Sequence, residues 1–242
     1  MKRVAVLLAL VIVVGAAAAA ARITDPGTRS PADVERAGPR ILATGDSLMR
    51  GVDRELEKQL RRGQRASLRS DLHIGDGITN APWVRTARRQ VRDYRPTVTV
   101  AFMGGNDGYD MRGARCCHKM WVAKYTSRVE TMIHTYLRGG SAEVYWLTLP
   151  AAESGRRREI FPKVNRAIRR AVRASGSHAH VVDAWAALTP DDRYRRTIPL
   201  RGKRVKIRHP DGIHLVSAGA AIVADLIVKA LVRDGVIASA VR

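Results

Sequence analysis

The sequence predicts an α/β domain in which a mostly parallel β-sheet is covered by helices on both faces. From residue 40 onward, short β-like runs alternate with helical patterns, and this alternation is typical of a parallel sheet. In addition, residues 97–103 form a nearly uninterrupted run of apolar and β-branched residues. Such a run is expected of a parallel strand that is buried on both faces.

The elements of this sheet can be assigned in order along the chain. Strands are predicted at 41–44, 67–74, 97–103, 143–149 and 179–182, and helices at 47–62, 83–94, 121–137, 162–175 and 217–233. Pro96 marks the end of the second helix, and Pro150 ends the fourth strand. Pro162 suits the first turn of the fourth helix, and Gly176 ends that helix.

The chain before this domain has two parts. Residues 1–21 combine a basic start with an apolar run of residues 4–21 that ends in alanines. This composition predicts a secretory signal peptide, or alternatively an uncleaved membrane anchor, since the run is just long enough to span a bilayer. Residues 22–39 contain Pro and Gly among charged residues and are predicted to be a linker. We therefore expect an exported domain at 40–242 that is periplasmic, extracellular or held at the outer side of the cytoplasmic membrane.

The composition is strongly basic. The formal net charge is +21, of which Lys2 and Arg3 in the export segment contribute two, while a hydrophobic content of 45% argues against disorder. A field of this sign attracts polyanions, and at a cell envelope these are anionic polymers and phospholipid head groups. Specific nucleic-acid binding fits poorly with export. The alternative is an arginine-rich composition whose charges are simply solvated.

Two adjacent cysteines, Cys116 and Cys117, are the only cysteines of the chain. Their position excludes a framework of spaced disulfides, and consecutive residues rarely converge on one tetrahedral metal ion. An exported location makes oxidation plausible. A vicinal disulfide, an intermolecular bridge and two free thiols all remain open.

Candidate site residues follow three of the predicted strands. Ser47 follows the first strand, Gly77 the second and Asn106 the third. Since the carboxyl ends of parallel strands meet at one edge of a sheet, these residues are expected to lie together where such sheets bind ligands. Ser47 is the candidate nucleophile, whereas Gly77 and Asn106 are candidate donors to an oxyanion. Taken singly, Ser47 could be a helix cap and the other two could be turn residues.

The sequence Asp211-Gly212-Ile213-His214 precedes the last predicted helix. His214 is the candidate base for Ser47, and Asp211 lies near enough in sequence to hold the other imidazole nitrogen. The alternatives are a tight turn at Asp-Gly and a surface histidine. His209 is expected at most to support the reacting residues from nearby. As a set, these residue types and their placement indicate acyl transfer through a serine.

These motifs resemble those of the SGNH hydrolases, also called the GDSL esterase/lipase superfamily. The four marker residues of that superfamily fall on Ser47, Gly77, Asn106 and His214. The matching stretches read Gly-Asp-Ser-Leu at 45–48, Gly-Gly-Asn-Asp at 104–107 and Asp-Gly-Ile-His at 211–214. The similarity is closest to a bacterial cell-envelope subgroup of unknown function, on the stretches 144–150, 182–185 and 211–219.

The resemblance covers about residues 40 to 235. It implies a three-layer α/β/α flavodoxin-like fold with a central five-stranded sheet. It also implies that Ser47 is the nucleophile, His214 the base and Asp211 its partner. The oxyanion hole would comprise the Ser47 amide, the Gly77 amide and the Asn106 side chain. Gly75 is the alternative donor, because this chain has Gly-Asp-Gly where the superfamily often has Ser-Gly or Asn-Gly.

The expected function is that of an exported serine esterase that hydrolyses short acyl esters, such as O-acetyl groups on an envelope polysaccharide. No metal and no organic cofactor is required. Aromatic residues make up only 5% of the chain, and no long apolar lid segment is present, so bulk lipid is a poor substrate. One alternative is an O-acyltransferase that uses the same site and needs a sugar acceptor. Another is a non-catalytic polyanion-binding protein, which would bind equally well without Ser47.

Overall fold

The computed structural model describes residues 38–62 and 65–239. Within these ranges five strands form one sheet in the order β2-β1-β3-β4-β5, and all neighbouring strands are parallel. The strands are β1 (Arg40–Gly45), β2 (Ser67–Leu72), β3 (Val98–Phe102), β4 (Glu143–Leu147) and β5 (Ala179–Val182). The predicted five-stranded parallel sheet is confirmed, and each strand overlaps its expected range.

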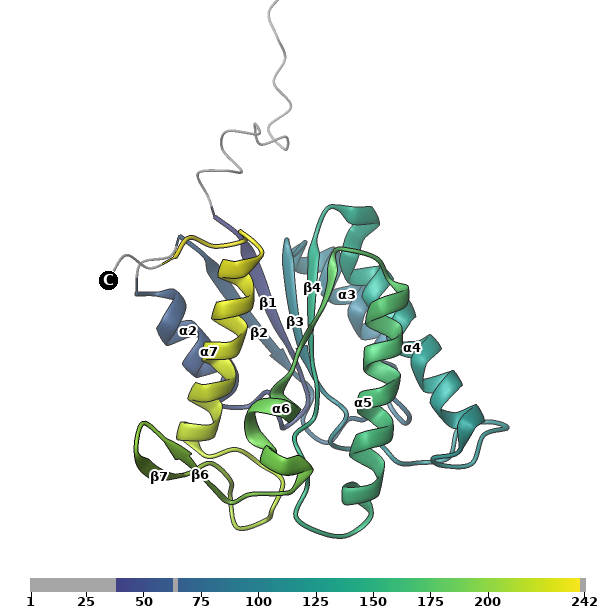
Figure 1. Cartoon of the computed structure of the whole chain (residues 1–242). Coiled ribbons are helices and arrows are strands. Elements are labelled where there is room, and N and C mark those ends of the chain that lie inside the picture. Colours follow the sequence, from purple (N-terminus) through teal and green to yellow (C-terminus); the bar gives the residue numbers. More distant parts are fainter. Residues whose placement is uncertain (1–37, 63–64, 240–242) are drawn as a thin grey trace, which may run out of the picture.

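Helices cover both faces of the sheet (Figure 1). They are α2 (Val52–Leu60), α3 (Trp83–Tyr94), α4 (Lys119–Leu137), α5 (Arg156–Ala174), α6 (Ala184–Leu188) and α7 (Ser217–Arg233), with short 3-10 turns at Arg138–Gly140 and Pro190–Asp192. On one face α4 packs against both α3 and α5, and on the other α2 packs against α7. This is the three-layer α/β/α arrangement that the sequence predicts.

The core lies between these layers and encloses the central strand. Every residue of β3 is buried, as expected for a strand covered on both sides. Trp121, Tyr125 and Tyr136 of α4 are also buried completely. The edge strand β2 is partly exposed along its length, which agrees with its polar sequence. Burial of large aromatic side chains contributes strongly to stability.

The strand register brings the candidate site residues to one edge. Gly45, the last residue of β1, lies beside Leu72 of β2 and Phe102 of β3, which are the last residues of their strands. A Cβ on Gly45 would lie 2.0 Å from the Phe102 carbonyl oxygen, so only glycine allows this close approach. The three chain segments that follow these strands therefore begin side by side.

Two predicted helices differ from the observed ones. Residues 47–51 form turns ahead of α2, so Ser47 lies outside the helix rather than at its first position. Helix α5 begins at Arg156, six residues before the predicted start, and Pro162 lies inside it. Pro162 favours a helix start in sequence terms, but α5 tolerates the missing N–H within its second turn because packing of the whole helix determines its extent.

The segment between α6 and α7 carries a feature that was not predicted. Strands β6 (Thr197–Leu200) and β7 (Lys203–Lys206) form an antiparallel hairpin, which lies at the carboxyl-end edge of the main sheet (Figure 1). Its sequence is short and basic and contains Pro199, so alternation of apolar and polar residues is weak there.

The expected export segment at 1–21 and the expected linker up to residue 37 lie outside the described residues. Within the described ranges no helix is both long enough and apolar enough to cross a membrane. The described residues cover the predicted domain at 40–242 up to residue 239, apart from residues 63–64.

Cys116 and Cys117 are bonded to each other in the structure, which is the first of the three alternatives left open above. They lie in the segment between β3 and α4, where the Cys116 amide donates a hydrogen bond to Asp110 Oδ1 at 2.7 Å. Nearby, the Trp121 indole donates to the Tyr109 carbonyl oxygen at 2.8 Å. These contacts attach the loop to the first turn of α4.

Candidate active site

Ser47 lies in the turn that connects β1 to α2. Its neighbours Leu48 and Met49 are buried in the core, whereas Ser47 is only partly buried. The apolar side chains therefore anchor the turn while the hydroxyl group faces the edge of the sheet. This placement leaves the Ser47 hydroxyl accessible to a substrate.

His214 contacts Ser47 although 167 residues separate them in the chain. The His214 Nε2 atom lies 2.8 Å from Ser47 Oγ, and His214 Nδ1 lies 2.7 Å from Asp211 Oδ2. An ionised carboxylate can only accept a hydrogen bond, so Nδ1 carries the proton and Nε2 accepts from the Ser47 hydroxyl. The structure thus brings the three predicted residues together in one hydrogen-bonded chain.

Asp211 is held in its ionised form. Partial burial alone would raise the pKa of Asp211, but hydrogen bonds from the His214 ring and from the Ile213 and His214 amides outweigh it and lower the pKa to about 2. Asp211 Oδ1 accepts from these amides at 2.8 and 3.0 Å. The carboxylate is therefore negative at all ordinary pH values, as stabilising an imidazolium requires.

Asp46 joins the Ser47 turn to the loop that follows β3. Its carboxylate is completely buried and accepts hydrogen bonds from the amides of Leu48, Gly104 and Gly105 at 2.9, 2.9 and 2.8 Å. Burial raises the pKa of Asp46 to about 6, because the charged form loses water. Leu48 adjoins Ser47 and Gly105 adjoins Asn106, so one side chain fixes the two segments relative to each other.

Asn106 lies next to the turn that follows β2. Its side-chain nitrogen is 3.5 Å from the Asp76 carbonyl oxygen, at the long limit for a hydrogen bond. This contact places the amide of Asn106 beside the Gly75-Asp76-Gly77 turn. The two candidate sources of oxyanion donors are therefore adjacent.

The two glycines of this turn differ in the state of their amides. The Gly77 amide already donates to Asn80 Oδ1 at 2.8 Å, and Gly77 is buried against Asp107 and Asn106. Gly75 is exposed, has a φ of +90° and has no atom within 4 Å of an added Cβ. Within residues 38–62 and 65–239 its amide has no hydrogen-bond acceptor. The geometry therefore favours Gly75 over the predicted Gly77 as a free donor.

A second buried carboxylate supports the Asn106 loop. Asp107 Oδ1 accepts from the amide and hydroxyl of Thr79, both at 2.7 Å, and Asp107 Oδ2 accepts from the Tyr125 hydroxyl at 2.7 Å. Burial raises the pKa of Asp107, although these hydrogen bonds favour the charged form. Asp107 thereby connects the segments after β2 and β3 to helix α4.

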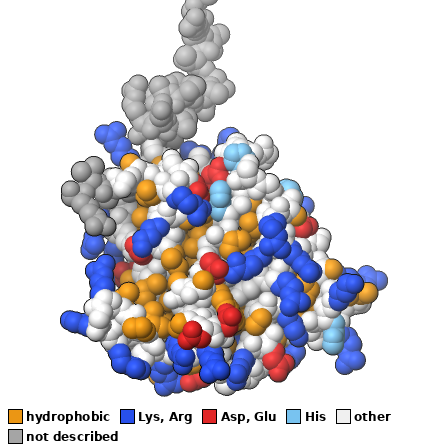
Figure 2. All heavy atoms as spheres, in the orientation of Figure 1, with side chains coloured by type: hydrophobic (Ala, Val, Ile, Leu, Met, Phe, Trp, Pro, Cys, Tyr) orange, Lys and Arg blue, Asp and Glu red, His pale blue; other side chains and the backbone are white. Residues whose placement is uncertain are grey.

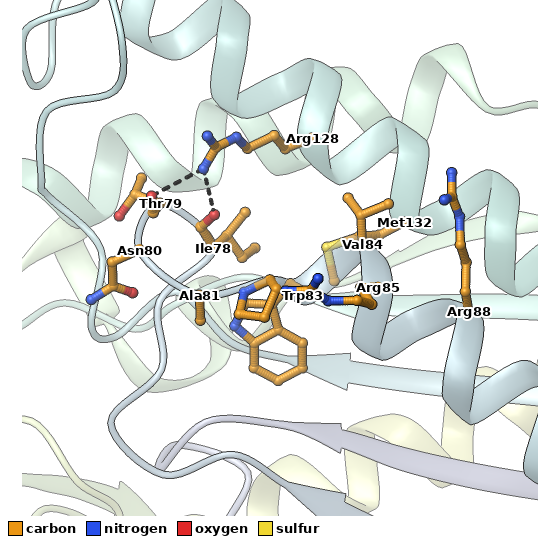
Figure 3. Close-up of a pocket in the computed structure, with 11 residues that line it drawn as sticks. Ile78, Thr79, Asn80, Ala81, Trp83, Val84, Arg85, Arg88, Arg128 and Met132 are labelled. Atoms are coloured by element: carbon orange, nitrogen blue, oxygen red, sulfur yellow. Dashed lines mark hydrogen bonds between the residues drawn. The ribbon is translucent and has the colours of Figure 1, made fainter.

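Arg128 holds the same turn from α4. Its Nη1 donates to the carbonyl oxygens of Ile78 and Thr79 at 2.8 and 3.0 Å (Figure 3). These residues line a hollow of about 540 Å³, which also borders the start of α3, including Arg85 and Arg88. The hollow lies beside the turn rather than at Ser47, which lines a different one.

Arg208 supports the loop that carries His214. It is completely buried and donates to the carbonyl oxygens of Ile213 and Ala151 at 3.0 and 3.3 Å. Burial lowers the pKa of Arg208 to about 10. Since Ile213 adjoins His214, this arginine fixes the backbone directly before the imidazole.

The roles of Asp46, Asp107 and Arg208 were not predicted. Asp46 and Asp107 adjoin Ser47 and Asn106 in the sequence, which was the only available signal. Arg208 had none, because a buried arginine cannot be told from the exposed ones in a chain with 43 basic residues. His209 donates its backbone amide to the His214 carbonyl oxygen at 2.9 Å.

The hollow at Ser47 is small. It measures about 250 Å³ and is lined by Ser47, Arg50, His209, Asp211, His214 and Leu215. A separate hollow of about 140 Å³ borders Asn106 together with Arg156 and Arg157 of α5. Arginine side chains line both hollows, so positive charge lies on each side of the site.

Solved structures share this fold. The lipase/acylhydrolase from Enterococcus faecalis superposes with a TM-score of 0.58 at 20% identity, covering 80% of this chain and 95% of that one. The M. smegmatis aryl esterase has a TM-score of 0.58 at 14% identity, with coverage of 81% and 99%. The acetyl xylan esterase AlAXEase has a TM-score of 0.54 at 19% identity, with coverage of 79% and 99%. At these identities the similarity confirms the expected fold and not a substrate.

Among curated proteins, no sequence matches the chain significantly. A match to a protein family spans residues 40–230, which is nearly the whole described domain and includes Ser47, Asn106, Asp211 and His214. That family is described as Protein of unknown function (DUF459). The chain belongs to this family, and it carries the fold of GDSL-type lipases and acylhydrolases.

Proposed function

We propose that this protein is an exported serine esterase that hydrolyses short acyl esters. The observation that carries the proposal is the hydrogen-bonded chain from Ser47 Oγ to His214 Nε2 at 2.8 Å and from His214 Nδ1 to Asp211 Oδ2 at 2.7 Å. Ser47 Oγ attacks the ester carbonyl carbon while His214 Nε2 takes the hydroxyl proton. Asp211 orients the ring and stabilises the imidazolium.

The remaining steps use the same groups. His214 returns its proton to the leaving alcohol, and an acyl group remains bound to Ser47. Water then enters, His214 removes a proton from it, and the hydroxide attacks the acyl carbon. The acyl group leaves as a carboxylic acid while His214 returns the proton to Ser47 Oγ, which restores the hydroxyl. No metal or cofactor takes part in this sequence.

The oxyanion that forms during each attack needs preorganised donors. We assign this role to the Ser47 amide, the Gly75 amide and the Asn106 side-chain amide. In the described ranges the two backbone amides have no other acceptor, and Asp46 holds the Ser47 and Asn106 segments together. Because these groups are fixed before substrate binds, they cost little reorganisation when charge develops.

A short acyl group on a carbohydrate is the preferred substrate. The hollow at Ser47, about 250 Å³, suits a small acyl chain better than a long one. The chain has only 5% aromatic residues, which offers little apolar surface to bulk lipid. The signal-like composition of residues 1–21 supports an envelope location, where O-acetylated polysaccharides are accessible substrates.

Hydrolysis of p-nitrophenyl acetate and butyrate by the full-length chain tests the proposal. Ser47→Ala should lower kcat by at least about 10⁴-fold, whereas Ser177→Ala, a change at an exposed serine, should have no effect. Equal activity in all three proteins would exclude Ser47 as the nucleophile. Activity that requires an added sugar acceptor would instead identify an O-acyltransferase with the same site.

A further inference from the structure

Helix α5 is far more basic than its role in the core requires. It carries eight basic residues among nineteen and only one acid, Glu159. Its apolar residues, including Phe161, Val164 and Ile168, are buried and pack toward the neighbouring helix and sheet. The basic residues therefore lie on the faces of the helix that do not pack against the core.

Four of them form a stripe on the outer side of the helix. Lys163, Arg166, Arg170 and Arg173 are separated by three or four residues, so they project within an arc of about 80° at roughly 100° per residue. The arginines of the α5 stripe are exposed and Lys163 is half-buried. At about 1.5 Å per residue the stripe is about 15 Å long.

The charges of the α5 stripe are not compensated within the protein. In the described part of the chain none of its four residues has an ion pair, whereas Arg169 at its border pairs with Asp183 at 2.8 Å. Figure 2 shows a continuous band of basic side chains over α5. Like charges three or four residues apart destabilise a helix, so the stripe is unfavourable unless an external anion neutralises it.

The stripe leads toward the active-site edge. At the start of α5, Arg157 Nε donates to the Gly105 carbonyl oxygen at 3.0 Å and Arg156 Nη2 donates to the Gly108 carbonyl oxygen at 2.9 Å. These bonds attach the helix on both sides of Asn106. The first stripe residue, Lys163, follows about 10 Å further along the helix axis, given the helical rise.

We propose that the α5 stripe binds an anionic polysaccharide whose ester groups are presented to Ser47. A narrow row of cations suits a linear polymer with regularly spaced negative charges. A lipid surface fits less well, because helices that lie on membranes insert an apolar face and the apolar residues of α5 are buried in the core. The inference deepens the esterase proposal by naming an anionic polymer as the substrate class.

The test compares a variant that lacks the charges of the α5 stripe with a variant that lacks the same number of positive charges elsewhere on the protein. The first variant changes Lys163, Arg166, Arg170 and Arg173 to Gln, which keeps helix propensity similar. The control changes Arg54, Lys58, Arg61 and Arg62 to Gln; these exposed basic residues lie on or just after α2, in the opposite helix layer. Both variants lose four positive charges, and neither touches the catalytic residues.

Two quantities are measured with the full-length chains. Binding of fluorescent polygalacturonate gives Kd, and hydrolysis of acetylated polygalacturonate, acetylated xylan and p-nitrophenyl acetate gives kcat/KM. The stripe variant should raise Kd, and lower kcat/KM for the acetylated polyuronate, by about tenfold, since four exposed charge contacts add up. Its kcat/KM for the two neutral esters should stay unchanged, and added salt should weaken wild-type binding.

The opposite results are equally definite. If Kd rises equally in both variants, binding depends on net charge alone and the proposal that the α5 stripe binds the polymer is wrong. Stripe-dependent binding to vesicles of phosphatidylglycerol, together with stripe-independent binding to polygalacturonate, would replace the polymer by a lipid surface. If the wild type hydrolyses no ester at all, the esterase proposal fails, while the comparison of Kd values still decides whether the stripe binds the polymer.

Discussion

Asp46→Asn tests how the two segments of the site are held together. The buried Asp46 carboxylate accepts three amide hydrogen bonds, and burial raises its pKa from 3.8 to about 6. The folded protein thus binds this proton more tightly than the unfolded chain does. Stability from this group is therefore greatest below pH 4 and is lost as the pH rises through 6. The asparagine variant lacks this titration.

The size of the effect follows from the shift. A rise from 3.8 to about 6 corresponds to about 3 kcal/mol at about 1.4 kcal/mol per pKa unit. All other titrating groups are common to the two proteins and cancel in their difference. The free energy of unfolding of the wild type minus that of Asp46→Asn should therefore increase by about 2.4 kcal/mol between pH 7 and pH 4, because the unfolded carboxyl group is still partly ionised at pH 4.

Urea unfolding followed by tryptophan fluorescence at several pH values between 4 and 7 measures this difference. Asp225→Asn, which removes an exposed carboxylate together with its ion pair to Lys229 at 2.7 Å, reports the effect of losing a solvent-exposed negative charge. A difference between wild type and Asp46→Asn that is constant with pH would refute the reasoning. If the difference in free energy of unfolding becomes smaller as the pH falls, the amide donors stabilise the Asp46 anion by more than burial destabilises it.

Three further predictions concern the supporting contacts. Asn106→Ala should lower kcat for p-nitrophenyl acetate by about 10²–10³-fold with little change in KM; an equal kcat would remove Asn106 from the oxyanion hole. Tyr125→Phe deletes the hydroxyl that donates to Asp107 at 2.7 Å and should lower the free energy of unfolding by about 2 kcal/mol, measured by urea unfolding. Arg208→Met leaves the Ile213 and Ala151 carbonyl oxygens without this donor. We expect the free energy of unfolding to fall by about 2 kcal/mol and the hydrolysis of p-nitrophenyl acetate to be slower. Kinetics equal to those of the wild type would contradict the role of Arg208 in holding the His214 loop.

Much of the fold was accessible from local patterns. Each predicted strand overlaps an observed one, and the buried strands are short apolar runs bounded by polar turns. The ends of the helices and strands were harder to predict. Pro162 suggested a helix start, yet α5 begins at Arg156, since packing and not the proline determines where the helix extends.

The pair Asp211 and His214 was predictable for a similar reason. They lie three positions apart in the sequence, and their 2.7 Å contact forms within one loop. The choice between Gly75 and Gly77 was not predictable, because it depends on which amide is already satisfied. Asn80 accepts from Gly77, and no sequence pattern distinguishes that use from donation to a substrate.

The sequence by itself determined the order of the five sheet strands and the five longer helices, the residue types of the site and the spacing of Asp211 and His214, since these depend on neighbours within a few positions. Only the tertiary structure decided that Ser47 Oγ meets His214 across 167 residues. It also decided that Asp46 and Arg208 become buried supports and that the basic residues of α5 gather into an exposed stripe. Burial and long-range contact arise when separate elements pack together, so local patterns could name candidate residues but not their actual contacts.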